Sequence, residues 1–369
     1  MMNCKYFSLC GSCTLYGLSY EEQFKRKIDF MKNEFKEFDI KDFELFRSKE
    51  SRFRDRAEFR IFHKDNKISY AMNRIDKKAP LEIDSCEIVN NSIYSLMPSL
   101  KREIEKNLIL KEKLFAIEFL SSSTRDILIT LIYHKKIDEM WQKEANILSK
   151  KLNTALIGRS RKIKTVINRD FIEEKLKTGE KEYLYRYLEN SFTQPNSSVN
   201  SQMISWTKNK SISFSGDLLE LYCGHGNFTI PLSENFNRVL ATEISKTSIK
   251  SALFNAKLNG VKNITFVRLS SEELTSALKK ERVFRRLEGV RLDDYDFKTV
   301  FVDPPRAGLD EKTREFVKNF DNIIYISCNP VTLKRDLKDL TKVFDIKSFA
   351  LFDQFPYTNH LESGVILQK

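Results

Sequence analysis

Several kinds of residue and segment are scarce in this chain of 369 residues. Histidine occurs only four times, never at the spacing of metal ligands, so a histidine-based zinc site is not expected. No run of about 18 or more apolar residues is present, which argues against a membrane-spanning helix. The N-terminus also lacks the apolar core of a signal peptide. We therefore expect a soluble, cytoplasmic protein with no membrane partner.

The overall composition is that of a globular protein with a basic surface. Apolar residues make up 41% of the chain and aromatic residues 12%, which excludes a disordered polypeptide, and the length allows two domains. The 63 lysines and arginines exceed the 51 acidic residues, so the net charge is +12. Such a charge favours a polyanionic partner, although a solvated basic surface without a partner gives the same balance.

Three of the six cysteines stand close together at the N-terminus. The six are Cys4, Cys10, Cys13, Cys86, Cys223 and Cys328. In a cytoplasmic protein we expect these cysteines to be metal ligands, catalytic groups or core residues, and not to form disulfides. Cys4, Cys10 and Cys13 suit an iron–sulfur cluster or zinc, and either needs a fourth ligand. Cys86 is the candidate, because the remaining two cysteines fall in a different domain. Chance clustering of structural cysteines is the alternative.

The first half of the chain predicts an antiparallel α+β region. Ser19 and Glu22 form a capping box ahead of an apolar stripe with helical spacing. Residues 52–63 alternate between apolar and charged side chains, as in a strand with one buried and one charged face. Interleaved basic and aromatic residues on strands suit nucleic acid, but an ordinary solvated face looks similar. Further strands are predicted at 67–72, 114–120, 126–133, 155–158 and 162–168, and a helix through Trp141, Ala145, Leu148 and Leu152.

The second half predicts a parallel, doubly wound α/β sheet. A polar stretch at 189–201 marks the junction, and from Gly216 onward strands alternate with helices. The predicted strands cover 217–222, 238–244, 264–269, 298–303 and 323–327, with 347–352 and 364–368 as a closing pair. Helices are expected at 246–258, after Ser270 or Ser271, and at 331–340. The predicted parts of the chain are therefore 1–50, 51–188 and 189–369.

A glycine-rich turn follows the first strand of this second half. Gly224-His225-Gly226-Asn227 lets a ligand approach the backbone, and Glu243 at the end of the next strand can accept hydrogen bonds from ribose hydroxyls. A dinucleotide-binding enzyme prefers a third glycine to wrap the pyrophosphate, and that glycine is missing here. The pattern therefore fits S-adenosylmethionine, which carries no phosphate, better than NAD.

Two further strand ends carry reactive groups. Asp303-Pro304-Pro305-Arg306 ends one strand, and its arginine stands where methyltransferases of amino groups place an aromatic residue. This difference argues against methylation of an exocyclic amine. Cys328 lies in a turn between a strand and a helix, at the sheet edge where α/β proteins bind their ligands. A free cysteine is more often a small, buried apolar residue than a nucleophile. The role of Cys328 is therefore inferred from the neighbouring motifs.

Taken together, the motifs of the chain resemble those of the RNA 5-methyluridine methyltransferases. They are the glycine-rich turn with Glu243, Asp303-Pro304-Pro305-Arg306, Ser327-Cys328-Asn329-Pro330 and Leu361-Glu362-Ser363-Gly364. Segments 190–196, 219–224 and 351–358 are most similar to the members that act on tRNA. The resemblance runs from about residue 52 to the end. It implies an RNA-binding region at 51–188 and a Rossmann-like, S-adenosylmethionine-dependent methyltransferase domain at 189–369.

The resemblance also implies roles for individual residues. Cys328 would attack C6 of a uracil, which makes C5 nucleophilic enough to accept a methyl group, and Glu362 would then remove the C5 proton. The target uridine would be flipped out of its stack to reach the thiolate. The residues that would line the methyl-donor site are Gln194, Tyr222, Asn227, Glu243 and Asp303.

The resemblance points to an RNA partner but leaves its identity open. The expected partner is the T-arm of tRNA, or another RNA with a T-loop-like hairpin. Cys4, Cys10, Cys13 and Cys86 resemble instead the [4Fe–4S] site of members that act on ribosomal RNA, so uridine methylation in 23S rRNA is the alternative. A non-catalytic, cluster-bearing RNA-binding protein is a further alternative, but it would need neither a nucleophile nor a base. An NAD-dependent oxidoreductase is disfavoured by the incomplete glycine pattern.

Overall fold

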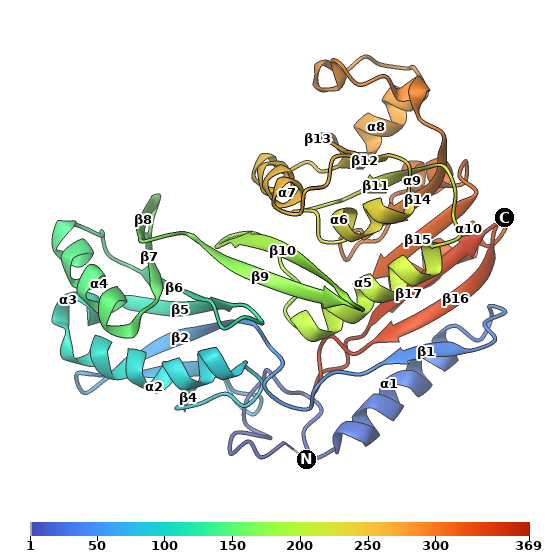
Figure 1. Ribbon diagram of the computed structural model, residues 1–369. Helices are drawn as coiled ribbons and strands as arrows, with labels where there is room; N and C mark the ends of the chain where they lie inside the picture. Colours follow the sequence, from blue (N-terminus) through green and yellow to red (C-terminus); the bar gives the residue numbers. More distant parts are fainter. Residues whose placement is uncertain (1) are drawn as a thin grey trace.

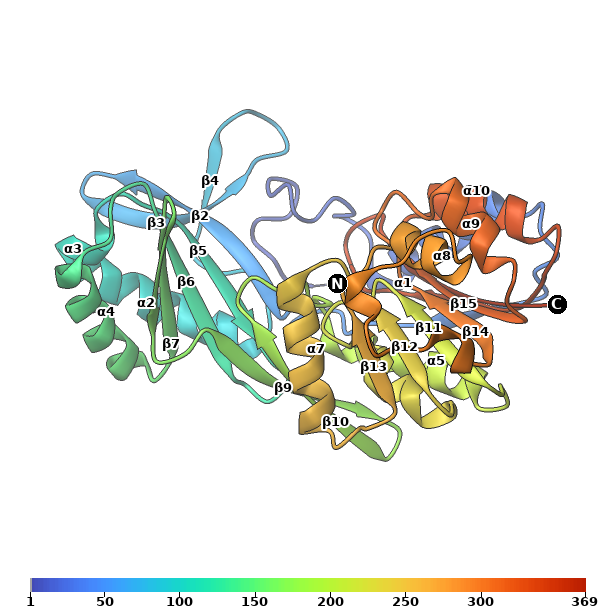
Figure 2. The same cartoon turned by 90° about the horizontal axis from the view of Figure 1, so that it is seen from above.

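The computed structural model describes residues 2–369, which form two lobes that lie side by side (Figure 1). One lobe is built on a seven-stranded sheet from the first half of the chain, and the other on an eight-stranded sheet that contains most of the second half. The hairpin of β9 (Phe171–Thr178) and β10 (Lys181–Leu188) lies between the lobes, as the view from above also shows (Figure 2).

The eight-stranded sheet has the strand order β1-β16-β17-β15-β14-β11-β12-β13. Its strands are β1 (Phe43–Phe46), β11 (Asp217–Leu221), β12 (Val239–Thr242), β13 (Ile264–Val267), β14 (Phe297–Val302), β15 (Asn322–Ser327), β16 (Asp345–Phe352) and β17 (Glu362–Gln368). The five strands from β15 to β13 pair in parallel, whereas β17 runs antiparallel to both of its neighbours. The predicted Rossmann-like α/β fold, with its closing pair, is therefore confirmed.

Helices cover both faces of this sheet, because successive residues of a strand point to opposite sides. Leu218 belongs to the core that contains α5, α6 and α7, whereas Leu219 belongs to the core that contains α1, α8, α9 and α10. These helices are α1 (Tyr20–Glu34), α5 (Ser197–Ser211), α6 (Thr229–Leu232), α7 (Lys246–Leu258), α8 (Ser271–Leu278), α9 (Glu311–Val317) and α10 (Pro330–Leu340). Within residues 2–369, no helix combines the length and the apolar character needed to cross a membrane.

The seven-stranded sheet has the order β4-β3-β2-β5-β6-β7-β8. Its strands are β2 (Arg56–Lys64), β3 (Lys67–Asn73), β4 (Pro80–Ile83), β5 (Leu114–Ser121), β6 (Ile127–Tyr133), β7 (Ala155–Ser160) and β8 (Ile163–Ile167). All neighbours are antiparallel except β6 and β7, which α4 connects in parallel. The helices of this lobe are α2 (Asn91–Lys106), α3 (Leu108–Lys111) and α4 (Glu139–Leu152). Trp141 of α4 lies against Gly158 of β7, where a larger residue would collide with the indole ring.

The β9–β10 hairpin joins the two lobes. Tyr183, Tyr185 and Tyr187 are buried on one face of β10 and belong to the same core as Leu218 of β11. The backbone N–H of Arg186 donates to the Asn255 side chain of α7 at 2.8 Å. The same core also contains Leu120 and Ile157 of the seven-stranded sheet, so the hairpin packs against both lobes.

The N-terminal residues are also part of the eight-stranded lobe. β1 extends the sheet by pairing in parallel with β16, with Phe46 opposite Phe352. Phe24 and Met31 of α1 are buried in the core beneath the same sheet. The first part of the chain thus supplies an edge strand and a helix to this lobe, while the predicted boundaries near residues 50 and 188 stay predictions.

Candidate active site

The carboxyl edge of the parallel strands gathers most of the predicted site residues. Each follows the last residue of its strand: Tyr222 after β11, Glu243 after β12, Asp303 after β14 and Cys328 after β15. These strands are direct neighbours in the order β12-β11-β14-β15, so their carboxyl ends meet at one edge. This edge faces the seven-stranded lobe and the N-terminal segment (Figure 1).

Cys328 and Glu362 lie where β15 ends and β17 begins. The antiparallel register ends at the pair Ser327 and Ser363, and continuing it by one residue brings Cys328 opposite Glu362. Burial raises the pKa of the Cys328 thiol to about 11, and the nearby carboxyl groups of Glu362 and Asp303 add to the rise. A thiol in this setting needs a neighbouring cation to become a thiolate near neutral pH.

Glu362 and Asp303 are two buried carboxyl groups that influence each other. Burial raises the pKa of Glu362 to about 8, and the charge of Asp303 adds to this rise. Burial alone raises the pKa of Asp303 to about 7. Groups whose pKa lies close to neutrality can both accept and release a proton during a reaction, as a general base requires.

Arg306 is a cation close to Cys328 and Glu362, and it was not predicted as a site residue. It lowers the pKa of both Cys328 and Glu362, and its Nη2 lies 3.3 Å from Nδ1 of His360. The side chain of Asn329, the N-cap of α10, donates to the Arg306 carbonyl at 2.9 Å and so fixes the turn that carries it. Its place in a turn after β14, the strand beside β15, is the sequence signal that could have identified it.

The predicted methyl-donor residues line two adjoining pockets. Gln194, Tyr222, Asn227 and Asp303 line a small cavity of about 60 Å³. Tyr222 also lines a larger neighbouring cavity of about 610 Å³, together with Glu243. Four of the five predicted donor-binding residues therefore surround one cavity, and the fifth lies in the cavity beside it.

The glycine-rich turn leaves room for a ligand and holds the acid that follows β12. Gly224 has a φ of +55°, and no atom lies within 4 Å of the position where its Cβ would stand. The N–H of Gly224 donates to Glu243 at 3.2 Å, and the N–H of Ser245 donates to the other carboxylate oxygen at 2.7 Å. Asn227 and Asn200 of α5 exchange two amide hydrogen bonds, at 2.8 and 2.9 Å. The open turn and the held carboxylate fit the nucleoside part of S-adenosylmethionine.

Glu220 is a second residue that the sequence analysis did not identify. It lies within β11 and lines the smaller cavity with Asp303. Burial raises the pKa of Glu220 to about 8, and Asp303 adds to the rise. Its Oε2 atom has no hydrogen-bond partner among residues 2–369. An acid inside an otherwise apolar strand was the available signal.

The four cysteines of the predicted metal site share one neighbourhood. Burial raises the pKa of Cys13, and Cys86, Cys10 and Cys4, in that order, add to the rise. Cys4, Cys13 and Cys86 also belong to one hydrophobic cluster. Within the described residues, however, no three histidine, cysteine or acidic side chains are placed so that they could hold a metal ion. The metal site therefore stays a prediction.

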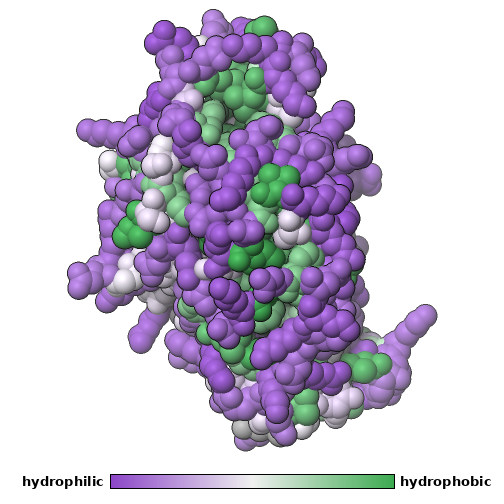
Figure 3. All heavy atoms as spheres, turned by 90° about the vertical axis from the view of Figure 1, so that its right-hand side faces the viewer, coloured by the Kyte–Doolittle hydropathy of each residue, from purple (hydrophilic) through white to green (hydrophobic). Residues whose placement is uncertain are grey.

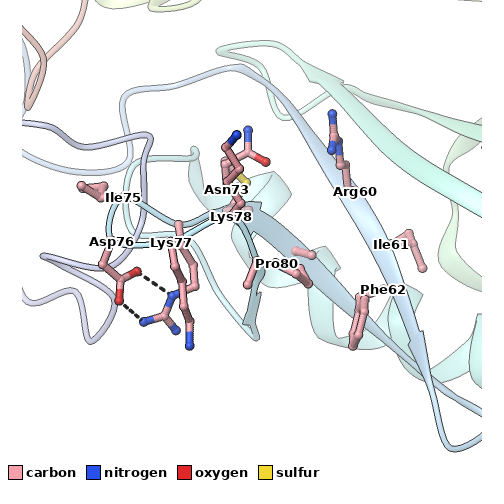
Figure 4. Close-up of a pocket in the computed structure, with 13 residues that line it drawn as sticks. Arg60, Ile61, Phe62, Asn73, Ile75, Asp76, Lys77, Lys78 and Pro80 are labelled. Atoms are coloured by element: carbon pink, nitrogen blue, oxygen red, sulfur yellow. Dashed lines mark hydrogen bonds and ion pairs between the residues drawn. The ribbon is translucent and has the colours of Figure 1, made fainter.

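A basic pocket opens on the seven-stranded lobe, between β2 and the β3–β4 connection. Its volume is about 640 Å³, and Figure 4 shows Arg60, Lys77 and Lys78 around it. Asp76, also in this pocket, is already paired with Arg74 at 2.6 Å, which leaves the other cations available. The face of the molecule that Figure 3 shows is mostly hydrophilic, with small separate hydrophobic patches.

A second cavity lies beside this basic pocket. It has a volume of about 220 Å³ and shares Met72 with the basic pocket. Phe355 and Thr358, from the loop that leads to Glu362, line its other side. The two cavities therefore lie next to each other, and the second is bordered by the loop that precedes Glu362.

A solved methyltransferase has the same fold as this chain. The crystal structure of Pyrococcus abyssi tRNA (uracil-54, C5)-methyltransferase in complex with S-adenosyl-L-homocysteine matches it with a TM-score of 0.75. The match covers 97% of this chain and 86% of that chain, at 23% sequence identity. The protein therefore has the fold of a Rossmann-like methyltransferase with an appended α+β lobe.

The particular family follows from sequence comparisons. The tRNA/tmRNA (uracil-C(5))-methyltransferase of Aliarcobacter butzleri is 55% identical over 100% of this chain and 99% of the relative. The protein of the same name from Nitratiruptor sp. is 52% identical over 100% of both chains. A family model described as tRNA (Uracil-5-)-methyltransferase matches residues 19–369. The chain belongs to the tRNA (uracil-5-)-methyltransferase family.

Proposed function

We propose that this protein transfers a methyl group from S-adenosylmethionine to C5 of a uridine in tRNA. The observation that carries the proposal is the placement of Cys328 opposite Glu362, beside the cavity lined by the donor-binding residues. Family membership supports the same reaction, since the relatives are named for it.

The first step needs a nucleophile, because C5 of uracil is a poor carbon nucleophile by itself. Cys328 would add to C6 as a thiolate, which moves electron density to C5 as an enolate. Arg306 supports this step, because its positive charge lowers the pKa of the thiol. The same cation lies close enough to the thiol to offset negative charge that develops on the pyrimidine.

The donor supplies an electrophilic methyl group when it is bound. Glu243 is held by two backbone N–H groups and would bind the ribose hydroxyls, while Tyr222 and Asn227 line the cavities beside it. Asp303 and Gln194 would close the smaller cavity on the side of the reacting groups. These residues would hold the methyl group of the donor near C5 of the thiolate adduct, so that methyl transfer occurs between two groups that are already positioned.

The last step removes a proton from C5 so that the thiolate can leave. Glu362 lies opposite Cys328 and would be the base. Its raised pKa suits it to hold this proton near neutral pH, because burial and Asp303 disfavour the charged carboxylate. Loss of the proton restores the C5–C6 double bond and releases Cys328.

We also propose the T-arm as the part of tRNA that binds. The basic pocket presents Arg60, Lys77 and Lys78 to the phosphate backbone of a stem, and the cavity beside it is lined by Phe355 and Thr358 of the loop before Glu362. The target uridine would leave its stack to reach Cys328. Cys4, Cys10, Cys13 and Cys86 would bind an iron–sulfur cluster or zinc in a structural role, because methyl transfer requires no redox step.

A substrate comparison tests the proposed function. A T-arm transcript and a 23S rRNA fragment would be offered to the purified protein with radiolabelled S-adenosylmethionine. We expect 5-methyluridine in the T-arm alone, and its loss from the tRNA of a deletion strain. If ribosomal RNA is methylated and the T-arm is not, the assignment to tRNA is wrong.

A further inference from the structure

The loop that leads to Glu362, residues 353–361, has an unusual centre. Tyr357 is fully buried and has a φ of +64°. A left-handed backbone conformation is unfavourable for a bulky side chain. It persists only where contacts with neighbouring residues stabilise it. Something outside the loop must therefore hold it.

Helix α1 supplies the first set of holding contacts. The side-chain oxygen of Gln23 accepts the backbone N–H of Tyr357. The ammonium group of Lys27 donates to the Phe355 carbonyl at 3.0 Å and to the Asp353 carboxylate at 2.6 Å. Gln23 and Lys27 are both buried, so water does not compete for these bonds.

The N-terminal segment supplies a second set. The N–H of Leu15 donates to the Tyr357 carbonyl at 3.0 Å, so both backbone polar groups of Tyr357 are bonded by the first 34 residues. The Phe7 ring lies 5.6 Å from the Tyr357 ring, centre to centre. Cys13 and Met2 belong to the same buried cluster as Tyr357. The start of the chain is thus packed directly against the loop before the proposed base.

We propose that Phe7, Gln23 and Lys27 are positioning residues that hold loop 353–361 so that Glu362 stays opposite Cys328. The proposal rests on the proposed role of Glu362 as the base. None of the three residues lines the donor cavities, so their effect should appear in proton removal and not in donor binding. The N-terminal segment would then support removal of the C5 proton, although it does not contact the reacting groups.

The test follows the fate of the covalent enzyme–RNA adduct in two variants. In Phe7→Ala and Gln23→Leu, we expect breakdown of the methylated adduct to slow on the order of 10-fold, because a carboxylate displaced by a fraction of an ångström transfers protons poorly. Adduct formation and binding of S-adenosylhomocysteine should stay unchanged. Phe30→Ala is the matched control, because Phe30 is on α1 but 49% exposed and outside these contacts.

Glu362→Gln is the reference that separates the two proposals. If it traps the adduct while Phe7→Ala and Gln23→Leu release it at the wild-type rate, the positioning role is wrong and the role of Glu362 stands. If Glu362→Gln traps no adduct, both proposals fail. Slowing of adduct formation and breakdown by the same factor, with a lower Tm, would show a merely structural role and would also overturn the inference. Phe7 is only half-buried, so Phe7→Ala is the variant more certain to fold.

Discussion

The carboxyl group of Asp303 lies close enough to Glu362 to raise the pKa of that buried acid, and Arg306 acts in the opposite direction. Two charged groups, Asp303 and Arg306, therefore act in opposite directions on the protonation of the proposed base. Burial makes the largest contribution, but only the charges can be altered without changing the shape of the site.

This arrangement predicts a pH dependence for adduct breakdown. Glu362 must be deprotonated to act as a base, so breakdown should accelerate as the pH rises through about 8. In Asp303→Asn, the neighbouring charge is gone, the pKa of Glu362 falls, and the midpoint should move to lower pH. Stopped-flow measurement of breakdown after adduct formation avoids any effect on donor binding. An unchanged midpoint would contradict the coupling.

Opposite phenotypes are expected for Cys328 and Glu362. Cys328→Ala removes the nucleophile, so neither methylation nor a covalent RNA complex should form. Glu362→Gln should still add and methylate, and should accumulate a methylated complex that survives denaturation, seen as a gel band shifted by the mass of the RNA. Glu288→Gln, at an exposed position, is the control and should turn over like wild type. Methylation by Cys328→Ala would refute the mechanism.

Arg306 should act on the first step. In Arg306→Met, the pKa of Cys328 rises above about 11, because the charge that lowers it is removed, and less thiolate is available at neutral pH. Adduct formation should slow about 10-fold for each unit of rise in pKa, and higher pH should restore it. Rapid-quench measurement across pH checks this. Arg282→Met, on the exposed segment after α8, should leave the profile unchanged.

The basic pocket should control RNA affinity and its dependence on salt. Lys77→Glu with Lys78→Glu should weaken T-arm binding and reduce the slope of log Kd against log salt by about one for each phosphate that is no longer neutralised. Donor binding should not change. Lys250→Glu with Lys257→Glu, at exposed positions of α7, introduces the same charge change away from this pocket. Equal weakening in both variants would mean that the overall charge, and not this pocket, binds the RNA.

The cysteine segment predicts a bound metal. Protein purified without oxygen should contain iron and absorb near about 400 nm if a thiolate-ligated cluster is present, or contain zinc without colour. Cys10→Ser should reduce the metal content, whereas Cys223→Ser, which changes the buried cysteine in the turn after β11, should not. Wild-type protein free of both iron and zinc would contradict the metal site.

Regular apolar patterns made much of the fold predictable from the sequence. The stripe through Trp141 and Leu148 predicted α4, and the apolar runs before Tyr222 and Cys328 predicted β11 and β15. These patterns are informative because the spacing of apolar residues within an element indicates both its type and the face that it buries.

Elements buried through polar or aromatic residues were missed. Helix α5 begins at Ser197, inside the stretch predicted as a junction between domains. It was missed because polar residues such as Asn200 and Thr207, which are buried in the structure, look like linker residues in the sequence. The β9–β10 hairpin buries tyrosines among charged neighbours, and its packing partners come from both lobes. Sequence alone does not show where those partners lie.

The candidate site was predictable as a set of residues but not as a geometry. Motifs identified Cys328 and Glu362, while their opposition depends on the β15–β17 register, which only the folded sheet defines. Arg306 and Glu220 were missed for the same reason, since their importance comes from the charges they face.

The pairing of β1 with β16 sets an order for folding during synthesis. The two strands are separated by roughly 300 residues, so the eight-stranded sheet gains its outer edge only when the ribosome has nearly finished the chain. The strands of the seven-stranded sheet all lie between Arg56 and Ile167, and they can pair much earlier. The seven-stranded lobe, to which we assign RNA binding, should therefore be complete while Cys328 is still being made. A nascent chain would then be able to hold RNA before it could modify it.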